Sequence, residues 1–291
     1  MAPGPSLDDV DDVTLQDLAT PLISSTSEHR PLLIPFNPKD IPCYVKPLPP
    51  NLGPVELAYL KERGGFSIPE DSFRDGLIQV YIEYVYPHLP CLDLNALVTG
   101  IDNTTGSISL IVLHAVMFAG LAFVGMCHIS SAGFSTRKAT QTRFFEKVRL
   151  LYEFDCEPDR VALVQALLLM TLHSHPLHEQ KDMWYWTGRA ISEAYSCGLH
   201  RAANPSDMTA QEAALRKKLW WCVFVRDRLV ALGMRRGMQV TVAYDAPMLT
   251  RDDFDSFLLS LGLADGSFAR DMEKQRRLST IFIATAKLCI A

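Results

Sequence analysis

The sequence lacks closely spaced cysteines. Its seven cysteines are scattered along the chain, and the two nearest, Cys197 and Cys222, are 25 positions apart. A zinc site built from thiolates needs its cysteines clustered, so we expect no metal ligands among them. An odd number of dispersed cysteines is typical of reduced thiols in an intracellular protein.

Common enzyme motifs are also absent. The chain has no G-x-S-x-G, G-x-x-x-x-G-K-[ST], H-E-x-x-H or G-x-G-x-x-G, so we expect no enzyme and no catalytic or cofactor-binding residues. Cys197 and His200 lie three residues apart, but a free cysteine in an apolar helix is usually a core residue. The N-terminus lacks the cationic start and the apolar stretch of a secretory signal.

A surplus of basic residues is missing as well. The chain has 28 Lys and Arg against 33 Asp and Glu, and its net charge is −5. Because nucleic-acid binding depends on cations that neutralise phosphates, this balance argues against broad nucleic-acid binding.

The N-terminal part has little that favours regular structure. The first 70 residues hold 12 of the 18 prolines and show no sustained hydrophobic period, which predicts a disordered tail over residues 1–66. Within it, Leu7–Leu18 mixes five aspartates with apolar residues. This composition is typical of a disordered activation segment, or of a solvated linker.

From Ser67 onward apolar residues recur at helical spacing, and no run alternates as a strand does. We therefore expect an all-α, multi-helix domain over residues 67–291. Ser67-x-x-Glu70 and Thr209-x-x-Glu212 each predict a capping box, and Pro158 is expected at the first position of a helix. A last helix from about Ser267 reaches Ala291 without a stop signal, which suggests truncation of a longer architecture.

One helix, predicted within residues 209–240, carries charges inside an apolar stretch. Since buried charges are costly unless paired, Arg226, Asp227 and Arg228 are expected to form a structural ion-pair lock to neighbouring elements. Carboxylates such as Glu193 or Asp245 are suitable partners for the arginines, and the sequence does not settle which acid pairs with which. The alternative, a basic and aromatic nucleic-acid surface that includes Trp220 and Trp221, fits the acidic balance poorly.

Several motifs follow one another along the chain. They are the aromatic Tyr81–Pro90, the V-Q-A-L-L-L of Val164–Leu169, the Trp184–Arg201 helix with Gly188 and Gly198, and Trp220-Trp221 followed by Arg226-Asp227-Arg228. In this order they resemble the middle homology region of fungal zinc-cluster transcription factors, most closely the regulators similar to cutinase transcription factors. The resemblance implies packing roles for Trp184, Gly188, Gly198, Trp220 and Trp221.

The resemblance implies a nuclear transcription regulator whose helical body responds to a small-molecule effector and controls metabolic or biosynthetic genes, lipid catabolism among them. Its partners would be other transcription factors or the transcription machinery, and it could form a homodimer. Zinc is expected only with an N-terminal six-cysteine cluster that this sequence does not contain, and DNA contact only through that missing domain or through a partner. A DNA-free partner or inhibitor of an intact zinc-cluster factor is the alternative.

Two further patterns leave alternatives open. Ile108–Ile129 is long and apolar enough to span a bilayer, although a buried helix of a large helical domain has the same composition. His173, His175 and His178 could hold a metal ion, but they lie where a helix gives way to a loop, and a polar interhelix loop explains them as well.

Overall fold

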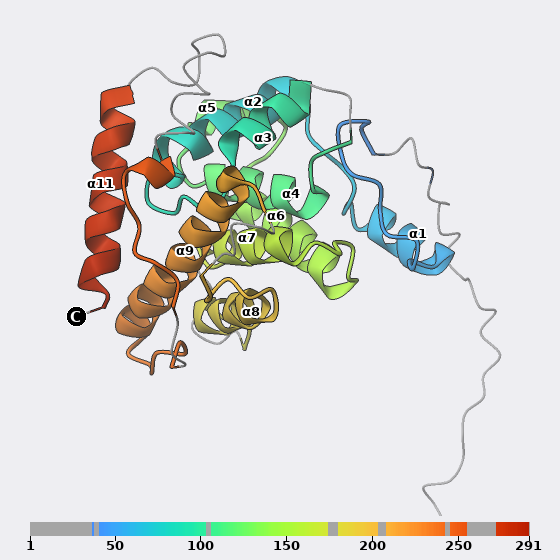
Figure 1. The fold of residues 1–291 in the computed structure, drawn as a ribbon. Coiled ribbons are helices and arrows are strands. Elements are labelled where there is room, and N and C mark those ends of the chain that lie inside the picture. The colour runs from blue at the N-terminus through green and yellow to red at the C-terminus, as the bar shows by residue number, and fades with distance from the viewer. Residues whose placement is uncertain are drawn as a thin grey trace, which may run out of the picture. The chain divides into compact units, whose positions relative to one another are not determined.

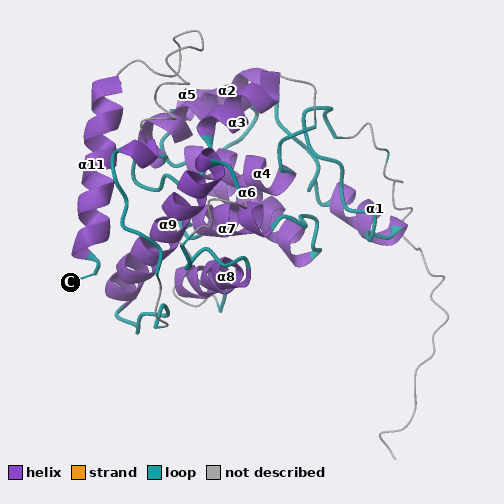
Figure 2. Ribbon diagram, viewed as in Figure 1, coloured by secondary structure: helices purple, strands orange, loops and turns teal. Residues whose placement is uncertain are grey.

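The computed structural model describes residue 37 and residues 41–102, 106–173, 180–202, 208–241, 245–254 and 272–290. All of them belong to one compact unit, residues 33–291. Within these ranges the regular structure is helical (Figures 1 and 2), and the one strand-like contact is an isolated bridge between Val45 and Ile108. The all-α prediction is confirmed.

The helices follow the chain in simple order. They are α1 (Pro54–Glu62), α2 (Asp71–Val80), the π-helical turn η2 (Tyr81–Val85), α3 (Leu94–Asp102), α4 (Leu110–Gly120), α5 (Met126–Ser131), α6 (Arg137–Glu153), α7 (Arg160–Met170), α8 (Met183–Ser196), α9 (Ala210–Met234) and α11 (Met272–Leu288).

The core is built around α4 and α7. Every residue of α4 is buried, because a helix that is apolar on all sides must be covered on all sides. It packs against α2, α6 and α7, and α7 in turn packs against α8 and α9. These contacts place α9 next to both α7 and α8, which positions the site described below.

The apolar run Ile108–Ile129 is not one helix. It divides into α4, which ends at Gly120, and the short α5, which begins at Met126. Among the described residues, no helix combines the length and the apolar character needed to cross a membrane. Helix α4 buries its apolar surface against other helices, as the alternative of a buried helix expected.

Residues 41–66, which we expected to lie in the tail, belong to the helical body. Val45, Leu60 and Phe66 are buried in the core. Helix α1 forms in this proline-rich range. Its Pro54 is tolerated because it occupies one of the first two positions of the helix, where proline costs no hydrogen bond. The high proline content led us to expect no helix here. The other residues of the expected tail, 1–36 and 38–40, lie outside the described residues.

One of the two predicted capping boxes is correct. Thr209 caps α9, accepting from the backbone of Glu212 at 3.2 Å while the Glu212 carboxylate accepts from the Thr209 amide at 2.8 Å. The Ser67–Glu70 box is wrong: α2 begins at Asp71 without a side-chain cap, and the Ser67 hydroxyl donates to the Gly64 carbonyl oxygen instead.

The prediction for Pro158 is also wrong. Helix α7 begins two residues later, at Arg160, and Asp159 is its N-cap. The Asp159 carboxylate accepts from the Val161 amide at 2.9 Å, so a capping side chain sets the start of this helix. The start of the last helix near Ser267 lies outside the described residues, which include α11 from Met272.

Lys147 of α6 is a buried cation held by neutral groups. Its Nζ donates to the Ser67 carbonyl oxygen at 2.6 Å and to the Ser67 hydroxyl at 2.9 Å, and it lies 4.8 Å from the centre of the Phe144 ring. Burial, with a smaller contribution from Arg143, lowers the pKa of Lys147 to about 8. Burial also lowers the pKa of the neighbouring His114 well below its ordinary value, so the His114 ring stays neutral at the pH values at which Lys147 titrates.

Lys147 is expected to make the unfolding free energy depend on pH. The folded-state pKa of about 8 lies below the model-peptide value of 10.5, so the unfolded chain binds more protons between these two pH values. Its contribution to stability therefore rises with pH across this window, by at most about 3 kcal/mol. Urea unfolding of the wild type and of Lys147→Met at about pH 7.5 and pH 10 measures it.

The unfolding free energy of the wild type relative to Lys147→Met should increase between those two pH values. Taking the difference removes the opposing contribution of the buried Tyr81 and Cys222, whose pKa values burial raises. Lys138→Met, at an exposed position of the same helix, is the matched control and should show no such change. A difference that is constant with pH would contradict this account of Lys147.

Candidate functional site

The chain turns back on itself after α9. The turn is made at Arg235, the C-cap residue of α9, whose backbone is left-handed with φ 52°. We call residues 236–241 and 245–254 the return segment. Hydrogen bonds and an ion pair join it to α9 at three levels, Asp227 with Val240, Trp221 with Pro247, and Lys217 with Asp253. Because the partner number rises as the α9 number falls, the return segment runs antiparallel to α9.

Asp227 attaches the start of the return segment to α9. Its side chain is 1% exposed. One carboxylate oxygen accepts from the Gln239 amide at 2.9 Å, and the other accepts from the Val240 amide at 3.0 Å and from Arg228 at 2.5 Å. A buried carboxylate is tolerated because three donors replace the water it has lost.

Arg228 completes this attachment. Its guanidinium pairs with Asp227 and lies 4.2 Å from the centre of the Phe224 ring. Neither of the suggested acids is its partner among the described contacts: the Glu193 carboxylate accepts from Arg160 at 2.8 Å, and Asp245 is joined to the neighbouring turn through its backbone amide. The pairing is local because Asp227 is the adjacent residue of the same helix.

Arg226 turns to another side of α9, toward the end of α7. Its Nε donates to the Thr171 hydroxyl at 2.7 Å and its Nη2 to the Thr171 carbonyl oxygen at 2.5 Å. Within the described part of the chain no carboxylate lies within 4.0 Å of it, so the expected ion pair of Arg226 is not found there. Burial lowers the pKa of Arg226 to about 10, which leaves it charged at neutral pH. Thr171 is the C-cap of α7, a position where a cation is favoured.

Trp184 and Gly188 hold the start of the return segment against α8. The Trp184 indole donates to the Gly237 carbonyl oxygen at 3.1 Å, and its own carbonyl oxygen accepts from the Gln239 side chain at 2.8 Å. A Cβ at position 188 would lie 2.4 Å from the Gln239 side-chain oxygen. Gly188 therefore leaves the space that Gln239 occupies.

Gly198 ends α8 and directs the chain toward the middle of the return segment. Its φ is +71°, a conformation that glycine adopts without strain. Two residues later, the His200 carbonyl oxygen accepts from the amides of Asp245 and Ala246 at 3.1 and 3.2 Å. The turn after α8 is thus a further place where the return segment is attached.

The two tryptophans of α9 are core residues. Trp220 is fully buried, with its ring edge-on to Tyr195 at 5.6 Å, and Trp221 donates to the Pro247 carbonyl oxygen at 2.9 Å. Buried rings are not available to stack on bases, so the alternative of a basic and aromatic nucleic-acid surface fails for these two side chains.

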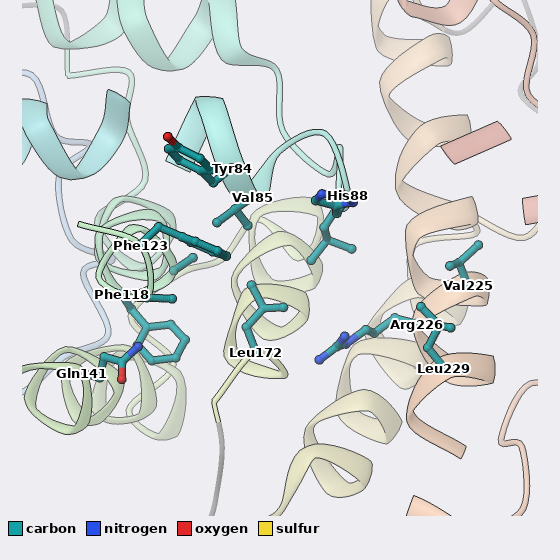
Figure 3. Close-up of a pocket in the computed structure, with 13 residues that line it drawn as sticks. Tyr84, Val85, His88, Phe118, Phe123, Gln141, Leu172, Val225, Arg226 and Leu229 are labelled. Atoms are coloured by element: carbon teal, nitrogen blue, oxygen red, sulfur yellow. The ribbon is translucent and has the colours of Figure 1, made fainter. Parts of the chain in front are cut away.

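A pocket of about 260 Å³ opens beside Arg226. Figure 3 shows aromatic and aliphatic side chains around it and the Arg226 guanidinium pointing from α9 toward Leu172. Its walls come from η2 and the turn after it, α4 and the turn after it, α6, the end of α7, and α9. Among the described lining residues, Arg226 is the only Lys, Arg, Asp or Glu.

Sequence patterns do not reveal this pocket, because its lining residues are far apart along the chain. The structural sign is exposure: Tyr84, Phe123, Leu172 and Leu229 are large apolar or aromatic side chains with 37–54% of their surface accessible. Scattered exposed apolar side chains are ordinary, but a group of them around one opening indicates a binding surface.

The remaining sequence hypotheses find little support in the described residues. His173 stacks on Phe145 with ring centres 4.4 Å apart, while His175 and His178 lie outside the described residues. No group of three metal-ligating side chains occurs among those described. Burial raises the pKa of the Cys197 thiol, which disfavours a reactive thiolate.

Comparison with known proteins agrees with the resemblance seen in the sequence. The profile described as "Fungal specific transcription factor domain" matches residues 78–290. Cutinase transcription factor 1 beta of Fusarium vanettenii is 42% identical over 259 residues, which are 86% of this chain and 29% of that protein. Transcription factor cpaR of Aspergillus oryzae is 34% identical over 261 residues, 85% of this chain and 43% of that protein.

A fusaric acid cluster transcription factor of Gibberella moniliformis is 27% identical over 181 residues, 62% of this chain and 26% of that protein. The chain thus spans less than half of the length of each of these relatives. No solved structure matches it. The profile match extends from the end of α2 to the end of α11 and includes every signature residue that attaches the return segment. The chain therefore belongs to the family of fungal-specific transcription factor domains.

Proposed function

We propose that this chain is the effector-response part of a transcription regulator that acts in the nucleus on metabolic or biosynthetic genes. The names of its relatives support this role, since one is a cutinase transcription factor and another is a fusaric acid cluster transcription factor. DNA contact is assigned to a zinc-cluster domain outside this sequence or to a partner protein, because the chain is acidic and its cysteines are dispersed.

The observation that carries this proposal is the placement of neighbouring α9 residues. Arg226 lines the pocket, and Asp227, the next residue, holds the return segment. A shift of α9 by a fraction of a turn moves both sites together. A ligand that binds one position of α9 more tightly than another changes the population of the two states by its difference in affinity.

A reporter experiment tests the role of the pocket. The whole chain is fused to a DNA-binding domain of known target and expressed in a fungal cell with the matching reporter. Ala122→Phe places a ring in the pocket from an exposed lining position, so it should change reporter output by about fivefold or more, a typical coupling between sites.

Leu232→Ser is the matched control, because Leu232 is 78% exposed and does not line the pocket. Its reporter output should equal that of the unmodified fusion at equal protein level. Equal output from the Ala122→Phe fusion and the unmodified fusion would count against a regulatory pocket. Co-purification of the chain with an intact zinc-cluster regulator would favour the alternative role of a DNA-free partner.

A further inference from the structure

The pocket beside α9 combines mainly apolar walls, with Gln141 and His88 as further polar lining residues, and the guanidinium of Arg226. We propose that it binds a small amphipathic acid, a molecule with an apolar body and a single carboxylate that pairs with Arg226. This inference rests on the proposed function, in which the same pocket is the effector site, and it adds the chemical class of the effector.

The walls select the body of the ligand. Val85, Leu89, Phe118, Ala119 and Val225 form the buried part of the lining. These side chains give water no hydrogen-bond partners, so an apolar body gains free energy by displacing it. Tyr84 and Phe123, stacked at 5.5 Å on the rim, extend this surface outward.

Arg226 selects the head group. Its bonds to Thr171 use Nε and Nη2, and among the described residues no acceptor is bonded to Nη1. A guanidinium has five N–H donors in a planar fork that fits a carboxylate with two parallel bonds. Capping of α7 explains the two bonds to Thr171, but it does not account for the position of the Arg226 side chain at the wall of the pocket (Figure 3).

The electrostatics of the pocket agree with an anionic head group. Burial lowers the pKa of Arg226, and among the described residues no carboxylate lies within 4.0 Å of its guanidinium to compensate the charge. A partly buried charge without a counter-ion is costly, and an incoming carboxylate supplies the missing partner. An uncharged ligand of the same length fills the apolar space but leaves the Arg226 guanidinium without a counter-ion.

The size of the pocket limits the ligand. A volume of about 260 Å³ lies just below the usual range of about 300–1,000 Å³ for small-molecule pockets. A short or medium chain acid fits this volume, and a longer one would extend past the rim. Octanoate is therefore a suitable probe, with 1-octanol as its uncharged counterpart.

Calorimetric titration of the whole chain with these two probes tests the ligand class. Octanoate should bind about 10- to 100-fold more tightly than 1-octanol, the range expected for hydrogen bonds to a charged group. Equal affinity for the two probes would overturn the assignment of an acid, although an apolar effector and the proposed function would survive it.

Leu229 allows a test that leaves Arg226 in place. It lies three residues after Arg226 on the same side of α9, lines the pocket and is 47% exposed, so polar substitutions there should not disturb the fold. Leu229→Glu brings an internal carboxylate to Arg226 and should weaken octanoate binding about tenfold or more. Leu229→Gln has nearly the same shape without the charge and should stay within about threefold of the wild type.

Octanoate binding that is equally strong in Leu229→Glu and Leu229→Gln overturns the role of Arg226. If octanoate fails to bind the wild type while Ala122→Phe still changes reporter output, the ligand class is wrong and the regulatory pocket stands. If octanoate fails to bind and Ala122→Phe has no effect on the reporter, both proposals fall. Binding that Ala122→Phe does not weaken places octanoate outside the pocket and also overturns the inference.

Discussion

Replacing Asp227 with alanine is expected to lower the free energy of unfolding by about 3–5 kcal/mol, the range for removing one partner of a buried ion pair. The carboxylate is 1% exposed and accepts from two backbone amides of the return segment, Gln239 and Val240, and from Arg228. Without it, the amides and the guanidinium lose their acceptor in a region that water reaches poorly.

Urea unfolding of the wild type and Asp227→Ala measures this loss. Asp71→Ala is the matched control, because the Asp71 side chain is 83% exposed and its partner Arg74 also pairs with Asp75. Its unfolding free energy should change by no more than about 0.5 kcal/mol. If Asp227→Ala were as stable as this control, the return segment would not depend on the carboxylate.

Gly120→Ala is expected to destabilise the protein by about 3 kcal/mol, at the upper end of the range for overpacked cores. A Cβ at this position would lie 2.3 Å from the Leu77 carbonyl oxygen and 3.1 Å from its carbonyl carbon. Both atoms belong to the backbone of α2, which packs against α4, so relief requires one helix to move. Leu77 is itself fully buried, which restricts that movement.

Gly76→Ala, next to Leu77 in α2, is expected to stabilise the protein, which is opposite to the effect of Gly120→Ala. Nothing lies within 4 Å of a Cβ at this position, so alanine adds no clash and lowers the entropy lost on folding. The unfolding free energy should rise by about 0.5–1 kcal/mol. Thermal or urea unfolding of the two variants compares them directly, and a shift in the same direction for both would contradict the close approach of α4 to α2.

The sequence was informative where local chemistry decides the structure. Thr209 and Glu212 cap α9 as expected because both partners lie within one turn. The motif residues Trp184 and Gly188 were expected to pack, and the structure shows that they do so against the return segment. That partner could not be foreseen, because the contact joins two segments about 50 residues apart and depends on the turn after α9.

The sequence was misleading where proline content and charge were considered without tertiary context. Helix α1 tolerates Pro54 because the residue lies at its start. The charged triplet was expected to act as a unit, but its members diverge: Asp227 and Arg228 attach the return segment, whereas Arg226 reaches the end of α7. The α9 face on which each residue lies determines this division, and helical periodicity alone does not show what covers each face.

Under the proposed function, two adjacent residues of α9 belong to two different sites, Arg226 to the pocket and Asp227 to the attachment of the return segment. Coupling between them needs no long pathway, because a movement of one helix changes both. In Figure 1, α9 lies alongside α8, and it also contacts α7 and α11. A small displacement of α9 thus alters several packing contacts at once. A helix with this property is one that a ligand can shift between two packing arrangements.

Amide hydrogen exchange at Gln239 and Val240, with and without octanoate, is the most direct test of this coupling. If the return segment opens only when α9 leaves its ligand-bound position, octanoate at about ten times its dissociation constant should slow exchange of these two amides about tenfold. Slower exchange confined to residues that line the pocket, with Gln239 and Val240 unchanged, would contradict the account.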